Sequence, residues 1–115
     1  MIKKVTTAVA YMCSPLPENN PEAVIDIIQQ RSQIAQMAAE KNINITAECI
    51  DYHIADGNCP QFRRMLSYLT RHKVDYVLHA EFGETQSGER FEVRCVAMDG
   101  EPYKALSSVH QITQP

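Results

Sequence analysis

Short apolar runs alternate with stretches of helical periodicity along this chain, and that alternation limits the fold more than any other feature. Residues 5–12, 43–50, 74–80 and 91–98 are apolar or alternate apolar with polar side chains, as β-strands do. Helical patterns separate the first three runs, and this order implies right-handed crossovers between parallel strands. The sequence therefore predicts a three-layer α/β domain with helices on both faces of a mostly parallel sheet. The sheet should have four or five strands, with the first strand in its interior.

The first predicted helix has a defined start and a long periodic stripe. It begins at Asn20-Pro21, where the asparagine can cap the helix and the proline fits its first turn. The spacing continues to about Lys41 and marks the side expected to face the sheet: Val24, Ile27, Ile28, Arg31, Ile34, Ala35 and Ala38. The pattern predicts a long amphipathic helix against the sheet.

The second predicted helix opens at Cys59-Pro60 and has an apolar side and a basic side. The apolar side, expected in the core, carries Phe62, Met65, Leu66 and Leu69. The basic side and the residues just after it carry Arg63, Arg64, Arg71, His72 and Lys73. A solvated helix face is the ordinary interpretation of these charges. Contact with an acidic protein or with DNA is the alternative.

Size and charge restrict the class of protein. The 115 residues fit one domain, 1–115. The net charge is -3 and the pI about 5.7, whereas a free-standing, non-specific nucleic-acid binder usually carries a basic face. DNA contact is therefore expected to be weak or made through a partner. No segment approaches the ~20 apolar residues of a membrane span, and the N-terminal run does not resemble a signal peptide. These features predict a cytoplasmic protein without membrane contact.

The cysteines and the polar loop after residue 50 are candidate ligand sites. The four cysteines lie far apart with no CxxC pair, so reduced thiols are expected: Cys13, Cys49, Cys59 and Cys95. The loop offers metal-ligating side chains at irregular spacing: Asp51, His53, Asp56 and Cys59. No second cluster supports them. The sequence therefore predicts neither a metal site nor a cofactor.

Four segments together carry a resemblance to a known family. They are Tyr11-Met12-Cys13-Ser14, Glu48-Cys49-Ile50-Asp51, residues 60–66 and residues 74–78. In this order and spacing they resemble the catalytic domain of the serine recombinases, the resolvase/invertase family. The likeness spans roughly Lys4 to Met98 and implies a resolvase-like fold. It also implies that Gln30-Arg31 matches the glutamine-arginine pair on the family's long helix. No C-terminal DNA-binding domain is expected to follow.

The catalytic positions implied by this resemblance do not hold the family's catalytic residues. Read without a gap, Cys13 stands at an arginine, Ser14 at a small apolar residue and Pro15 at the nucleophilic serine. A shift of one residue would make Ser14 the nucleophile. Asp51 matches the family's aspartate. The remaining positions, where the family has an arginine before proline, an aspartate-arginine pair and a further arginine, are Cys59, Gly83, Glu84 and Ser87.

These replacements bear directly on activity. Attack of a serine on a phosphodiester places negative charge on oxygen, and positioned cations stabilise that transition state. Losing one such donor typically costs ~10²–10³ in rate. The sequence therefore favours a catalytically inactive module that acts in regulation or protein contact, and descent from a mobile element is compatible with this. One alternative is a site-specific recombinase subunit with Ser14 as nucleophile. Another is a thiol-based sensor that uses Cys13 and Cys59.

Self-association is also expected. The tail, residues 102–112, holds only three apolar residues at helical spacing, which leaves little room for the helix through which the family pairs. A homodimer with a different, smaller interface in this region is therefore predicted, because exposed apolar surface usually marks an interface.

Overall fold

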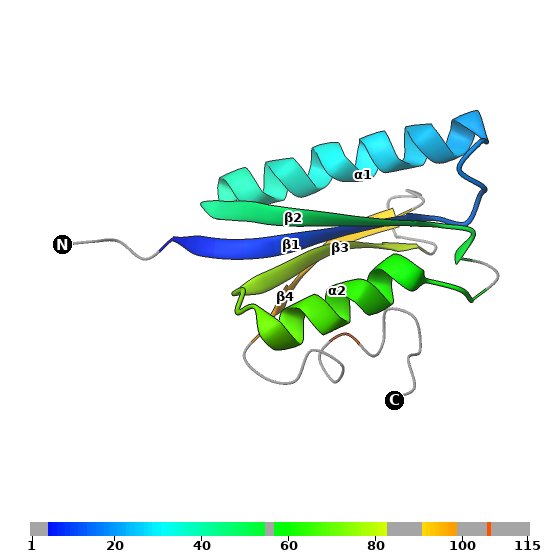
Figure 1. The fold of residues 1–115 in the computed structure, drawn as a ribbon. Helices are drawn as coiled ribbons and strands as arrows, with labels where there is room; N and C mark the ends of the chain where they lie inside the picture. The colour runs from blue at the N-terminus through cyan, green and yellow to red at the C-terminus, as the bar shows by residue number, and fades with distance from the viewer. Residues whose placement is uncertain (1–4, 55–56, 83–90, 99–105, 107–115) are drawn as a thin grey trace.

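The computed structural model describes residues 5–54, 57–82, 91–98 and Leu106. Two helices and four strands follow one another in the predicted order (Figure 1). Their bounds are β1 Thr6–Ser14, α1 Pro21–Glu40, β2 Ile43–Tyr52, α2 Pro60–Arg71, β3 Tyr76–Phe82 and β4 Phe91–Ala97. Most bounds lie within two residues of the expected ones. The tail from Pro102, with the interface predicted for it, lies outside the described residues except Leu106, which is buried.

The four strands form one sheet in the order β2-β1-β3-β4. β1 pairs in parallel with both β2 and β3, so the first strand is interior, as predicted. β3 and β4 are antiparallel. The α/β class is confirmed, and the four-stranded sheet is mixed, with two parallel pairings and one antiparallel pairing. Residues 83–90, which connect these two strands, are too few for a parallel crossover, because such a connection needs about a dozen residues or more and usually includes a helix.

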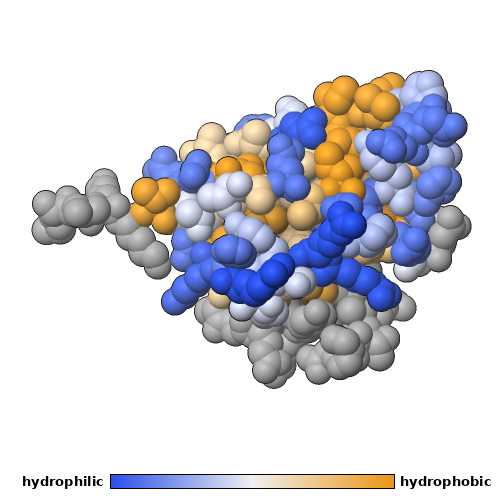
Figure 2. Space-filling model, viewed as in Figure 1, coloured by the Kyte–Doolittle hydropathy of each residue, from blue (hydrophilic) through white to orange (hydrophobic). Residues whose placement is uncertain are grey.

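α1 covers one face of the sheet, but it is rotated from the predicted orientation. Its capping is as expected, because Asn20 Oδ1 accepts a hydrogen bond of 2.9 Å from the Glu22 N–H. The side chains it buries are Ala23, Asp26, Ile27, Gln30, Ile34 and Ala38. Val24 and Ile28 belong to the predicted stripe, yet both are exposed. Figure 2 shows this apolar surface over the N-terminal half of α1.

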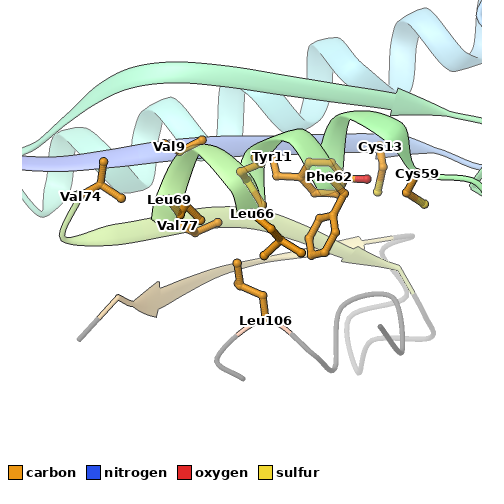
Figure 3. Close-up of a cluster of buried hydrophobic side chains, with 11 residues drawn as sticks. Val9, Tyr11, Cys13, Cys59, Phe62, Leu66, Leu69, Val74, Val77 and Leu106 are labelled. Atoms are coloured by element: carbon orange, nitrogen blue, oxygen red, sulfur yellow. The ribbon is translucent and has the colours of Figure 1, made fainter. Parts of the chain in front are cut away.

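α2 covers the opposite face and buries the four apolar residues predicted for it (Figure 1). Figure 3 shows this side of the core, which α2, β1 and β3 build together with Leu106. The rings of Tyr11 and Phe62 meet edge to face, with centroids 5.0 Å apart and planes inclined by 70°. The basic side of α2 is exposed, as expected for a solvated face: Arg63, Arg64, Arg71, His72 and Lys73. This packing places the carboxyl ends of β1 and β2 beside the start of α2.

Candidate functional site

The end of β1 holds the serine that would act as nucleophile in the recombinase alternative. Ser14 is fully buried. Its hydroxyl donates a hydrogen bond of 3.1 Å to Asp26 Oδ2 and accepts one of 3.2 Å from the Leu16 N–H. The hydroxyl thus holds the turn after β1 against α1. Pro15, the gap-free match to the family's serine, is half-buried in the same turn.

The backbone of the preceding residue is held by one side chain of α1. The Cys13 N–H donates to Gln30 Oε1 at 2.9 Å, and Gln30 Nε2 donates to the Cys13 carbonyl oxygen at 2.6 Å. Gln30 is completely buried, so both bonds are shielded from water. The neighbouring Arg31, second member of the matched pair, instead bonds Glu48 on the surface at 2.9 Å. The glutamine therefore fixes the strand end, and the arginine does not reach it.

Asp51, at the end of β2, is the centre of the buried polar network. Its Oδ2 accepts bonds of 2.8 Å from both the Tyr11 hydroxyl and the Phe62 N–H, and its Oδ1 accepts one of 3.0 Å from the Gln61 N–H. Cys59, at the N-cap position of α2, makes no capping side-chain bond. Asp51 therefore caps α2 from a neighbouring strand, which satisfies two free N–H groups of its first turn.

Cys13 and Cys59, which replace two family arginines, lie side by side in the buried cluster next to Tyr11 (Figure 3). Burial, together with the nearby Cys59, Asp51 and Asp26, raises the pKa of the Cys13 thiol to about 12. Burial, followed by Asp51, also raises the pKa of Cys59, although its bond with Tyr11 and the charge of Arg63 act in the opposite direction. Both thiols are thus protonated near neutral pH. The thiolate is the reactive form, so this environment suppresses their nucleophilicity.

Four other candidate residues from the sequence, Gly83, Glu84, Ser87 and Asp56, lie outside the described residues. His53 is exposed, has a positive φ of 61°, and donates its N–H to the Leu16 carbonyl at 3.3 Å. It lines an open hollow of about 380 Å³ beside Asp51. In the described part of the chain, no three His, Cys, Asp or Glu side chains gather as a metal site would require.

Four of the basic residues line two hollows away from this strand end, whereas the charge of Arg63 acts on Cys59. Arg64 and Arg71 border a groove of about 340 Å³ between α2 and β2. Arg71, His72 and Lys73 border a hollow of about 720 Å³ at the opposite end of the sheet, near the start of β3. His72 also stacks on Tyr68, with ring centroids 4.4 Å apart. The structure therefore keeps these side chains apart from Ser14.

Asp26 is the site residue that the sequence interpretation missed. It lies one helical turn before Gln30, and both are buried among the apolar side chains of α1. In the sequence, Asp26 and Gln30 form a polar pair at i, i+4 beside the apolar stripe. Such a pair predicts no contact unless the strand end that the two side chains bind is also known.

We expect the buried thiol and phenol to destabilise the fold at alkaline pH. Cys13 has an ordinary pKa of 9.0 and a folded value of about 12, so its contribution is complete below the lower value and is lost as pH rises through the higher one. From about pH 8 to about pH 10.5 the free energy of unfolding should fall by about 2 kcal/mol from this thiol alone. Burial raises the Tyr11 pKa as well, and adds to the loss.

Urea denaturation under reducing conditions at several pH values measures this effect. Cys13→Ala should give a shallower pH dependence than the unchanged chain, because the titrating thiol is gone. Equal slopes for the two proteins would contradict the assignment to Cys13.

Comparisons with known proteins give no relative for this architecture. No protein-family model, curated protein or solved structure matches the chain. Among the described residues, no helix is both long and apolar enough to cross a membrane. The likeness to serine recombinases thus rests on the four sequence segments and their spacing.

Proposed function

We propose that this chain is a serine-recombinase-like domain without catalytic activity, which acts in regulation through protein contacts. The observation that carries the proposal is the burial of Ser14 and the hydrogen bonding of its hydroxyl. Its side chain is buried, and its hydroxyl is bonded to the Asp26 carboxylate and the Leu16 N–H. A nucleophile for a DNA phosphate needs access to the phosphorus and cations around it.

The charges around the strand end support the same conclusion. The two ionisable carboxyl groups that act on the Cys13 thiol are Asp51 and Asp26. A phosphate placed here would meet negative charge where the transition state needs positive charge. Arg31, which could have supplied a cation, is engaged with Glu48 on the surface.

The polar groups at the strand ends also have structural roles. Asp51 caps α2, and Gln30 binds the backbone of Cys13. The raised pKa values of Cys13 and Cys59 weigh against the thiol-sensor alternative, because few thiolates would be present. A role in protein contact is favoured instead by the exposed apolar residues of α1, which no catalytic role explains.

We predict that the purified chain neither cleaves DNA nor forms a covalent adduct with it. The substrate is a supercoiled plasmid carrying the genomic DNA that flanks the gene, and denaturing gels detect nicks and protein-linked DNA. An active serine recombinase on a plasmid with its own site is the positive control. Unchanged protein and Ser14→Ala should give the same blank result. An adduct that disappears in Ser14→Ala would establish the recombinase alternative.

A further inference from the structure

One flank of α1 is apolar and lies over the outer edge of the sheet. Val24, Ile28, Arg31 and Ala35 follow one line along the helix and are all exposed. Val24 and Ile28 expose 46% and 57% of their surface. Arg31 on the same line bonds Glu48 of β2, which shows that this flank faces the β2 edge. The apolar stripe of the sequence is therefore turned partly toward this edge.

β2 itself is a long edge strand. It has ten residues and pairs only with β1 among the described strands. Its register with β1 shifts between Ala8 and Val9, whose partners are Ile45 and Ala47, so Thr46 is an extra residue. Beyond this bulge β2 pairs regularly up to Tyr52. Ile50 is half-buried and packs on the α1 side of the sheet. Edge strands of this length can pair with another strand unless something blocks them.

We propose that a second copy of this chain binds along this edge, through antiparallel pairing of β2 with β2 about a two-fold axis near Ile50. The axis is perpendicular to the sheet, so α1 of each copy lies on the same face. The two apolar flanks then pack against each other through Val24 and Ile28. This names the partner for the protein-contact role proposed above and rests on it.

The charges fit a two-fold axis at this position. It places Glu48 of one copy opposite Tyr52 of the other rather than opposite Glu48, so like charges do not face each other directly. The Arg31–Glu48 pair then borders the apolar contact as part of a polar rim. On the face covered by α2, Arg64 borders the groove between α2 and β2. Its long side chain is exposed and can turn toward solvent, so its charge need not be buried in the contact.

The contact area suits a weak dimer. Pairing about Ile50 places residues 48–52 of the two copies opposite each other, a length of roughly 17 Å, and the exposed Val24 and Ile28 side chains add a second layer to the contact. Specific interfaces bury about 1,200–2,000 Å² in total, and weak associations lie at or below the lower end of this range. A second copy supplies both a strand and a matching apolar flank. An unrelated extended peptide would supply only the strand.

Sedimentation equilibrium of the full chain under reducing conditions tests the proposal. We expect a dimer in the micromolar range, and roughly 100-fold weaker association for Val24→Lys/Ile28→Lys, because charged groups would be buried at the contact. The matched control is Val5→Lys, since Val5 is 62% exposed and directly precedes β1, at the opposite end of that strand from Ser14. This variant should associate normally. Circular dichroism checks that all variants fold.

Amide hydrogen–deuterium exchange shows which edge strand of the sheet, β2 or β4, forms the interface. Amides of residues 47–52 should exchange with deuterium more slowly at high than at low protein concentration, whereas those of β4 should not change. A monomer at high micromolar concentration, or protection of β4 instead of β2, would overturn this interface. A monomer that also fails to cleave DNA would remove the interface alone. DNA cleavage by a dimer would remove the proposed function and leave the interface.

Discussion

Replacing Asp51 with alanine is expected to lower the free energy of unfolding by about 2–5 kcal/mol, because one carboxylate serves three donors. The change removes the acceptor for the Gln61 and Phe62 N–H groups at the start of α2. It also leaves the hydroxyl of the fully buried Tyr11 without this acceptor. Urea denaturation followed by circular dichroism gives the change.

Two further variants separate the roles of Asp51. Asp51→Asn keeps an acceptor oxygen and should cost clearly less than Asp51→Ala. Tyr11→Phe removes the hydroxyl that loses its bond to Asp51, so Asp51→Ala should be less damaging in that background by about 0.5–3 kcal/mol. Strict additivity of the two changes would show that the Tyr11–Asp51 bond does not couple them. A stability change for Asp51→Ala within about 0.5 kcal/mol would refute the capping role altogether.

The second helix and the order of elements could be predicted from local pattern alone. Phe62, Met65, Leu66 and Leu69 form one uninterrupted apolar face, and all four are buried. The direction of β4 does not follow from its strand-like run at 91–98. The short connection, residues 83–90, leaves too few residues for a helical crossover and therefore favours the antiparallel pairing with β3.

In the first helix, periodicity does not separate the apolar residues that pack on the sheet from those that stay exposed. Its apolar stripe combines residues that face the sheet, such as Ile27 and Ile34, with residues that face the β2 edge, such as Val24 and Ile28. Hydrophobicity alone does not distinguish an internal core from a surface that meets another chain. The pattern fixes the helix, while the neighbouring strand decides how much of the stripe is covered.

The candidate site could be predicted only in part for a related reason. The absence of the family's arginines could be read directly from Cys13 and Cys59. The use of the remaining polar residues could not, because Asp51 reaches the first turn of α2 across a loop and Asp26 reaches Ser14 from another element. Such contacts depend on the tertiary packing of helix against strand. As a result, Asp51 caps α2 and Ser14 holds the turn after β1, although both stand at positions matched to an active site.

Gln30 gives the second large effect. Gln30→Ala is expected to lower the free energy of unfolding by about 3–5 kcal/mol, because each buried polar group left without a partner costs about 1–3 kcal/mol and a cavity adds to the cost. The groups that lose their partner are the backbone N–H and carbonyl of Cys13. The same denaturation measurement applies, and Gln33→Ala, exposed on the same helix, should change stability by less than about 0.5 kcal/mol.

Two substitutions at the same position distinguish hydrogen bonding from packing. Gln30→Met keeps most of the volume but neither bond, so it should remain strongly destabilising. Gln30→Glu keeps an acceptor for the Cys13 N–H but, when ionised, presents a second acceptor to the Cys13 carbonyl and adds charge near Asp26. It should therefore be damaging at neutral pH and less so in mild acid, where the new carboxyl group can take up a proton and donate. If Gln30→Met were as stable as the unchanged chain, the side chain would act by filling space, and the strand end would be held by other contacts.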